Sequence, residues 1–287
     1  MKQISVKDKY TLILDRTNWK LGTTDINFLV LSLAWYGISI PVYWVNLARA
    51  GNSNTIERMQ ILSKFIKLFG IDKIEIFLAD REFIGDNWLH WLDYYGVKFV
   101  IKIKVNSKIY YNKKYKRAIK SFRSLRRGNT RTLKCTLWDL ELTIVGYKHT
   151  DGEVYILATN GNPTLAVELY SMRWQIESMF LCLKSNGFNL EASHMVDANK
   201  LELLFGLLAI LTCWNCKVGC WFHVIKPIKI KNHNRPEQNL FHYGMTMPGT
   251  ILNNVMDYGK DFINVLKILK KPNLIDDDCY DMEWCCV

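Results

Sequence analysis

Four side chains that can handle a phosphate group lie in one short segment of the chain. They are Tyr170, Arg173, Glu177 and Lys184, within YSMRWQIESMFLCLK. On a continuous α-helix, steps of three, four and seven residues place all four on one face. Glu177 could then hold a metal ion while Arg173 and Lys184 bind phosphates on either side of it. An ordinary amphipathic helix with an ion pair between Arg173 and Glu177 would show the same pattern.

Two aspartates elsewhere in the chain could complete a metal site. Asp15 ends the apolar run YTLILD, and Asp80 ends the run IEIFLAD. Cleavage of a phosphodiester requires an activated water, a stabilised leaving oxygen and neutralised phosphate charge, which two Mg²⁺ ions supply. We predict that Asp15, Asp80 and Glu177 converge to hold these ions through carboxylate oxygens, and that Mn²⁺ can substitute. Taken singly, each acid is more often an ordinary surface or strand-end carboxylate.

The elements that must position these acids follow an α/β order. Their apolar runs and helical periodicity predict strands at 10–15, 26–37 and 38–47, a helix at 55–70, a strand at 74–80, a helix at 87–96 and a strand at 98–104. Three antiparallel strands, followed by helices that alternate with parallel strands, form the order of a ribonuclease-H-like fold. We therefore expect a mixed sheet with flanking helices.

A β-rich insertion is expected to interrupt this fold before the helix that carries Glu177. The segments 132–147 and 153–160 are typical of strands around an HTDG turn. Helices are predicted at 165–187, at about 197–224 and at 250–270. We accordingly divide the chain into a first part of the catalytic core at 1–104, the insertion at 105–163, a helical second part of the core at 164–225 and a partly helical tail at 226–287.

The charge of the chain indicates a polyanionic partner. The formal net charge is +11, and the sequence pI is about 9.2. Residues 98–134 contain fourteen Lys or Arg and no Asp or Glu, and Tyr110, Tyr111, Tyr115 and Phe122 are interleaved with these cations. This pattern favours nucleic-acid binding, with affinity that falls steeply as salt rises, although a solvated basic loop would look similar.

The eight cysteines are expected to be reduced thiols, because the N-terminal MKQISVKDKY does not resemble a secretory signal. Cys213, Cys216 and Cys220 share one face of an apolar helical stretch. We interpret them as buried thiols, although a zinc site with His223 as the fourth ligand would use the same spacing.

The most apolar stretch, at 201–214, is shorter than a membrane span requires and includes Glu202. We interpret this stretch as a buried helix. The protein is therefore expected to be cytoplasmic and to have no membrane partner.

Three motifs resemble those of bacterial transposases of the insertion-sequence-four family, which are DDE enzymes. The spacing of Tyr170, Arg173, Glu177 and Lys184 is similar to the family's Y-x2-R-x3-E-x6-K signature, and it ends in KSNG. ADREF around Asp80 and LDRTNW around Asp15 resemble the blocks around the family's two catalytic aspartates. The β-rich insertion is also a family trait. The resemblance covers about residues 10 to 190 and keeps the motifs in the family's order.

This resemblance implies a transposase catalytic core that cleaves and joins double-stranded DNA in cut-and-paste transposition, as a homodimer at the bacterial nucleoid. It assigns metal binding to the three acids. The side chains expected to contact DNA are Tyr170, Arg173, Lys184, Trp174, Arg81 and Lys104. Some family members stack a flipped base on an aromatic residue of the insertion, for which Trp138 is a candidate. Trp138 is otherwise expected to be a strand residue in the small core of the insertion.

One departure from the family leaves other functions open. Family members carry a helical domain before the first catalytic strand, which here begins about ten residues from Met1. We therefore expect this chain to lack that domain. The alternatives are a truncated, inactive DNA-binding remnant, which would bind without nicking, and a ribonuclease-H-like nuclease, which would cleave without joining strands.

Overall fold

The computed structural model describes residues 9–21, 23–185, 187–232, 236–253, 260 and 263–268. The chain forms two compact units. The sheet unit comprises Lys9–Ala34 and Tyr43–Trp174, and the helical unit comprises Trp35–Val42 and the described residues from Gln175 onward.

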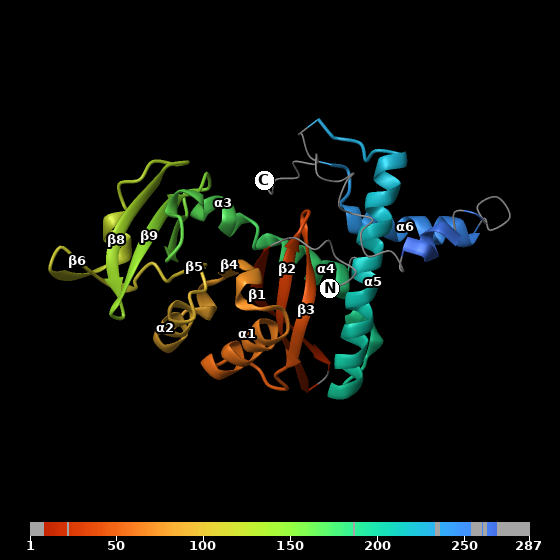
Figure 1. Ribbon diagram of the computed structural model, residues 1–287, viewed down its shortest axis with the longest axis horizontal. Helices are drawn as coiled ribbons and strands as arrows, with labels where there is room; N and C mark the ends of the chain where they lie inside the picture. Colours follow the sequence, from red (N-terminus) through yellow and green to blue (C-terminus); the bar gives the residue numbers. More distant parts are fainter. Residues whose placement is uncertain are drawn as a thin grey trace. The chain divides into compact units, whose positions relative to one another are not determined.

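A ten-stranded sheet, most of which belongs to the sheet unit, has the order β3-β2-β1-β4-β5-β10-β9-β8-β6-β7 (Figure 1). Its strands are β1 (Tyr10–Leu21), β2 (Thr24–Trp35), β3 (Ile38–Asn46), β4 (Ile74–Ala79), β5 (Phe99–Lys102), β6 (Lys108–Tyr111), β7 (Lys114–Arg117), β8 (Thr130–Leu137), β9 (Leu140–Lys148) and β10 (Val154–Thr159). β1 is antiparallel to β2 and parallel to β4, and β4 is parallel to β5. This arrangement confirms the predicted ribonuclease-H-like mixed sheet.

Local sequence explains why these strands and helices form. β2 and β4 are runs of buried apolar residues, which is typical of strands covered on both faces. Helix α1 (Thr55–Phe69) starts with a capping box between Asn54 and Glu57 and stops at Gly70, whose φ is 90°. Helix α2 (Asp86–Tyr94) buries Trp88, Leu89 and Leu92. Both helices pack beside the part of the sheet formed by β1, β4 and β5 (Figure 1).

β1 is longer than the predicted strand at 10–15. Its pairing with β4 ends at Leu14 and Ala79, but its pairing with β2 continues to Leu21 and Thr24. Beyond Asp15 the side chains alternate between buried and exposed positions, as expected where only one face is covered. The apolar run therefore marks the doubly covered part of the strand and not its end.

The predicted β-rich insertion is present, and its strands continue the same sheet. β10 pairs with β5 and β9, both antiparallel. The segment predicted at 132–147 is divided into β8 and β9 by a two-residue turn at Trp138 and Asp139, with φ of 48° and 60°. Trp138 is 38% exposed in this turn, so its expected place as a strand residue of the insertion core is wrong. The boundaries of the insertion at 105 and 163 stay predictions.

The predicted helix at 165–187 is not continuous. A 3₁₀ turn η4 (Pro163–Leu165) leads into α3 (Ala166–Ser171), and α4 (Trp174–Lys184) follows after a break at Met172 and Arg173. At the break, the Ser171 hydroxyl donates to the Glu168 carbonyl at 2.6 Å, and backbone bonds span three residues instead of four. A hydroxyl that bonds to the backbone in this way competes with the helical pattern. The predicted continuous helix through the four phosphate-handling residues is therefore wrong, and their position on one face stays a prediction.

Two helices dominate the helical unit, α5 (Ala198–Ile225) and α6 (Leu240–Asn253). Their backbones approach closely at two glycines. A Cβ atom on Gly219 would collide with the carbonyl of Leu240, and one on Gly244 would collide with the carbonyl of Asn215. The predicted helix at about 197–224 is confirmed. Of the helix predicted at 250–270, the structure describes 250–253, 260 and 263–268, all helical; α6 begins earlier, at Leu240.

The cysteines of α5 are free thiols, and two of the three are fully enclosed. Cys216 and Cys220 are at most 1% exposed, and Cys213 is half-buried. Burial raises the pKa of Cys213 to about 11. His223 accepts a hydrogen bond at Nδ1 from the backbone N–H of Ile228. These positions confirm the interpretation as buried thiols. Cys285, Cys286 and the acidic residues 276–278 lie outside the described residues.

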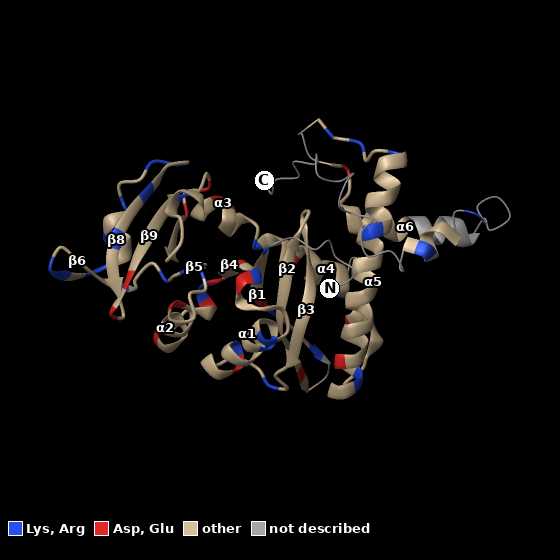
Figure 2. Ribbon diagram, in the orientation of Figure 1, with Lys and Arg blue, Asp and Glu red and all other residues tan. Residues whose placement is uncertain are grey.

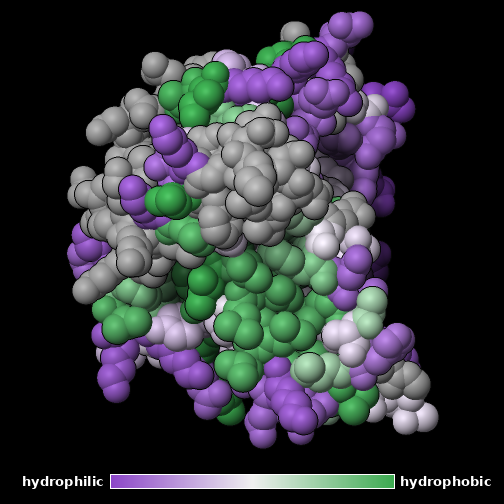
Figure 3. Space-filling view, turned by 90° about the vertical axis from the view of Figure 1, so that its right-hand side faces the viewer, coloured by the Kyte–Doolittle hydropathy of each residue, from purple (hydrophilic) through white to green (hydrophobic). Residues whose placement is uncertain are grey.

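α5 is also longer than the apolar stretch predicted at 201–214. By length and composition alone, its 28 residues could cross a membrane, and 56% of its most apolar window is buried. Soluble core helices pass the same test, so this is weak evidence for a span. Leu203, Leu207 and Ile210 are each more than half exposed. Figure 3, which views the molecule from the right-hand side of Figure 1, shows apolar side chains gathered in one exposed area.

Candidate active site

The parallel pairing of β1 and β4 brings two of the predicted acids to one edge of the sheet. Leu14 lies beside Ala79 in the register, and each is followed directly by an aspartate. Asp15 and Asp80 are therefore neighbours at the point where the parallel pairing ends, although β1 itself continues to Leu21. The strand residues before them are completely buried, which fixes the backbone that carries both carboxylates.

Asp15 is held by a buried ion pair. Nη1 of Arg173 lies 3.1 Å from Oδ2 of Asp15, and the two side chains are 7% and 15% exposed. Oδ1 of Asp15 accepts a hydrogen bond from the backbone N–H of Arg16 at 2.8 Å. Arg173, at the break between α3 and α4, therefore supplies a positive charge to the carboxylate. Its predicted contact with DNA stays a prediction.

Asp80 is held by a neutral donor. The Tyr170 hydroxyl donates to Oδ1 of Asp80 at 3.0 Å, and the backbone N–H of Arg81 donates to the same oxygen at 2.7 Å. Burial of Tyr170, together with the nearby Asp80 carboxylate, raises the pKa of the Tyr170 phenol, although Arg173 acts in the opposite direction. The phenol therefore stays protonated near neutral pH and keeps its role as a donor to Asp80.

Glu177 and Lys184 belong to the helical unit. Glu177 lies in the first turn of α4, and Lys184 in the last turn forms an ion pair with Glu191 at 2.9 Å. Among the residues that the structure describes, no three His, Cys, Asp or Glu side chains are grouped closely enough to hold a metal ion. The convergence of Glu177 with the two aspartates stays a prediction.

The other predicted DNA contacts lie at the surface of the sheet unit. Arg81 and Lys104 are exposed, and Trp174 is 59% exposed, with the Arg173 guanidinium 5.5 Å from its ring centroid. Trp138 also has a backbone role, since its carbonyl accepts a bond from Nε2 of His90 at 2.7 Å. The contacts of these side chains with DNA, and the flipped-base role of Trp138, stay predictions.

A second ionic network, which sequence reasoning missed, supports the same edge of the sheet. Arg16 follows Asp15, and Glu82 lies two residues after Asp80. Nε and Nη2 of Arg16 bond to the two carboxylate oxygens of Glu82 at 2.7 and 3.0 Å. The other three N–H groups of Arg16 donate to Asn27, Gly51 and Asn52 at 2.7 to 3.0 Å. All five guanidinium donors are thus used, and β1 is tied to the turn after β4.

We expect Glu82→Gln to lower the free energy of unfolding by about 2 kcal/mol, because it weakens charge-assisted bonds in a site where the Arg16 and Glu82 side chains are only 13% and 27% exposed. Urea denaturation measures the change. Asp25→Asn is the matched control. It removes the same charge from an exposed bridge to Lys20, and it should cost less than about 0.5 kcal/mol. Equal losses in the two variants would contradict a special role for the Arg16–Glu82 pair.

Comparisons with known proteins place this chain in a family. The family model described as "Transposase DDE domain" matches residues 7–215. No curated protein matches the chain.

Three solved structures show limited likeness. The match to the piggyBac transposase in its synaptic complex with hairpin DNA covers 93% of this chain and 58% of the piggyBac chain, at 11% identity and a TM-score of 0.43. The match to the HTLV-2 integrase catalytic core domain in complex with magnesium covers 33% of this chain and 62% of the integrase chain, at 14% identity and a TM-score of 0.26. The match to endonuclease V from Bacillus subtilis covers 60% of this chain and 78% of the endonuclease chain, at 8% identity and a TM-score of 0.33.

This chain thus spans little more than half of the piggyBac transposase chain that it matches. All three TM-scores are below 0.5, so the assignment rests on the family model, which covers most of the chain. On that basis, this chain belongs to the family of transposases that carry a DDE domain.

Proposed function

We propose that this chain is the catalytic core of a bacterial transposase of the insertion-sequence-four type, which cleaves DNA at an element end and joins the freed 3′-OH to another phosphate. One observation carries the proposal. Asp15 and Asp80 lie side by side where the parallel pairing of β1 and β4 ends, and each bonds to a side chain of the Y-x2-R segment. The two aspartates and the Y-x2-R part of the signature thus lie together in the sheet unit.

The donor set of this site fits Mg²⁺. Asp15 and Asp80 are half-buried carboxylates, and hard oxygen ligands of this kind suit the ion. We propose that Glu177 is the third ligand. When bound, two Mg²⁺ ions would supply an activated water and neutralise phosphate charge, and Mn²⁺ would substitute for them.

The side chains around Asp15 and Asp80 are proposed to orient their carboxylates for metal binding. Tyr170 and the backbone of Arg81 both donate to Oδ1 of Asp80, so Oδ2 is the oxygen proposed to face the metal. Arg173 holds one oxygen of Asp15 in place through the ion pair at 3.1 Å.

The remaining signature residues are proposed to hold DNA. Arg81, Lys104 and Trp174 are exposed on the sheet unit and would contact the duplex beside the cleaved phosphate, and Lys184 would bind the 5′ side of the element end. We propose that two copies of the chain act together, one on each element end, at the bacterial nucleoid.

Purified chain incubated with Mg²⁺ tests the activity. We expect nicked circles from supercoiled plasmid, and covalently joined products from a labelled duplex that carries the terminal repeat flanking the reading frame. Chelation of the metal should abolish both products. Nicking without joined products would instead favour a nuclease that does not transfer strands. Binding without nicking would favour an inactive remnant, and either result would overturn the proposal.

A further inference from the structure

The hairpin formed by β6 and β7 concentrates positive charge at one end of the sheet. Residues 108–117, here called the basic ribbon, read KIYYNKKYKR, with five Lys or Arg and no Asp or Glu. β7 is the last strand of the sheet, so one long side of the ribbon has no neighbouring strand. Figure 2 shows Lys and Arg gathered at this end of the sheet unit. The ribbon therefore presents charge where a large ligand can reach it.

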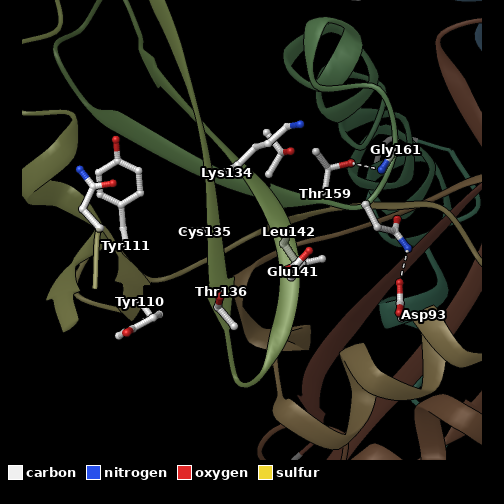
Figure 4. A pocket seen from close by; sticks show the side chains of 13 residues that line it. Asp93, Tyr110, Tyr111, Lys134, Cys135, Thr136, Glu141, Leu142, Thr159 and Gly161 are labelled. Carbon is white, nitrogen blue, oxygen red and sulfur yellow. Dashed lines mark hydrogen bonds between the residues drawn. The ribbon is translucent and has the colours of Figure 1, made fainter. Parts of the chain in front are cut away.

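The basic ribbon is anchored at its base and open along its length. At the base, Ala118 bonds to Ser107 at 2.8 Å through the backbone, and Ile109 is completely buried. Among the described residues, Tyr110 and Thr136 form the one pair that joins β6 to β8. A hollow of about 690 Å³ lies beside the ribbon, with Tyr110 and Tyr111 on one side and Asp93 on the other (Figure 4). The ribbon is therefore accessible from this side as well.

Both faces of the ribbon carry cations and aromatic rings. Residues paired across the two strands share a face, because side chains alternate along each strand. One face carries Lys108, Tyr110, Tyr115 and Arg117, and the other carries Ile109, Tyr111, Lys114 and Lys116.

The rings on each face are held in place by their neighbours. The Tyr110 and Tyr115 rings lie 5.0 Å apart, and Tyr115 is 74% exposed. On the other face, Nζ of Lys116 lies 4.0 Å from the centroid of the Tyr111 ring. The tip is a narrow two-residue turn at Asn112 and Lys113, with φ of 50° and 60°.

A ligand with anionic groups on two sides fits this distribution. The major groove of duplex DNA is about 12 Å wide, admits a two-stranded ribbon and has a row of phosphates along each side. A single strand lying on one face would leave the cations of the other face unmatched. We infer that the basic ribbon enters the major groove, with its cations on the phosphates of both strands and its tyrosines toward the base edges. This inference rests on the proposed function, because it names the part of the DNA that the same chain holds.

Salt dependence of binding tests the inference. Without divalent metal, affinity for a short mixed-sequence duplex is measured by fluorescence anisotropy between about 50 and 200 mM salt. Lys108→Gln/Arg117→Gln and Lys114→Gln/Lys116→Gln should each reduce the slope of log affinity against log salt by roughly 1.8, since each phosphate contact contributes about 0.9. Lys114→Arg/Lys116→Arg should keep the wild-type slope. Lys64→Gln/Lys67→Gln, an equal charge change on exposed positions of α1, should also leave it unchanged.

Chemical protection identifies the groove. The wild-type chain should protect guanine N7, which lies in the major groove, from methylation by dimethyl sulfate, and both Gln double variants should lose this protection. A ligand of the minor groove should fail to displace the chain. Unchanged slopes in both variants, unprotected N7, equal affinity for single-stranded DNA, or displacement by the minor-groove ligand would each overturn the inference. None of these measurements requires cleavage, so a chain that binds in this way but never nicks would refute the proposed function alone.

Discussion

Asp80→Asn is expected to reduce strand cleavage by about a thousandfold, because loss of one carboxylate charge removes several kcal/mol of stabilisation from a metal-dependent transition state. Fold and stability should be preserved. The asparagine keeps the size of the side chain, and its oxygen can still accept the bonds that Tyr170 and the backbone of Arg81 make to Oδ1. Nicking of supercoiled plasmid under single-turnover conditions measures the rate, and thermal unfolding measures the fold.

Two comparisons separate chemistry from structure in this experiment. Asp80→Ala should lose cleavage to the same extent and should also lower the free energy of unfolding. Tyr170 is only 9% exposed, and its hydroxyl would lose its acceptor. Tyr170→Phe removes the hydroxyl but leaves the Asp80 charge in place, so it should retain far more cleavage than either Asp80 variant. An Asp80→Asn chain that cuts within tenfold of the wild-type rate would exclude Asp80 as a metal ligand.

Arg173→Ala is expected to lower the free energy of unfolding by about 3 kcal/mol, because it leaves the Asp15 carboxylate in a poorly solvated place without its cation. Nη1 of Arg173 and Oδ2 of Asp15 are 3.1 Å apart, and both side chains are less than a fifth exposed. Urea denaturation in the absence of divalent metal measures the loss. Added Mg²⁺ should then stabilise Arg173→Ala more than the wild-type chain, because Asp15 is no longer engaged by Arg173.

A double-mutant cycle isolates the pair. Asp15→Asn, Arg173→Ala and the combined variant are compared, and the combined loss should be smaller than the sum of the single losses, since neither unpaired charge remains in it. Arg173→Lys should restore part of the stability, because it returns the charge without the planar geometry. Additive losses across the cycle would show that the contact between the two side chains contributes no coupling energy.

The positions of the two aspartates could be predicted because they depend on strand order. Two buried apolar runs that each stop at an acid, the first opening a three-stranded meander and the second following one helix, have the order of a ribonuclease-H-like sheet, in which both acids lie at one site. The structure shows this arrangement for Asp15 and Asp80. Their partners were not predicted, because the signature indicates DNA contacts for Tyr170 and Arg173, whereas the structure pairs these side chains with Asp80 and Asp15.

The geometry of that signature could not be predicted from its spacing. Periodicity predicts one helix through Tyr170 and Lys184, but letters alone do not show that the Ser171 hydroxyl bonds to the Glu168 carbonyl or that Arg173 turns toward Asp15. Both contacts favour the break at Met172 over a continued helix. Similarly, alternation along residues 132–147 did not reveal the turn at Trp138, because tryptophan and aspartate are unusual at two left-handed positions.

The network of Arg16 and Glu82 left a weaker trace in the sequence. An arginine directly follows the first aspartate, and a glutamate lies two residues after the second. Once the two strands are known to be neighbours, these opposite charges are expected to pair. Without the register of β1 and β4, Glu82 could not be distinguished from an ordinary exposed acid of a loop.

β5 has partners on both sides, β4 in the catalytic sheet and β10 in the insertion. Val100 and Ile101 each pair with a residue of both strands. A force applied to the outermost strands would thus be transmitted through the backbone hydrogen bonds between neighbouring strands to β4, the strand that Asp80 follows. If DNA is held at the outer strands, as proposed, the strands between them and β4 set its distance from Asp80, and that distance would decide where the cut falls.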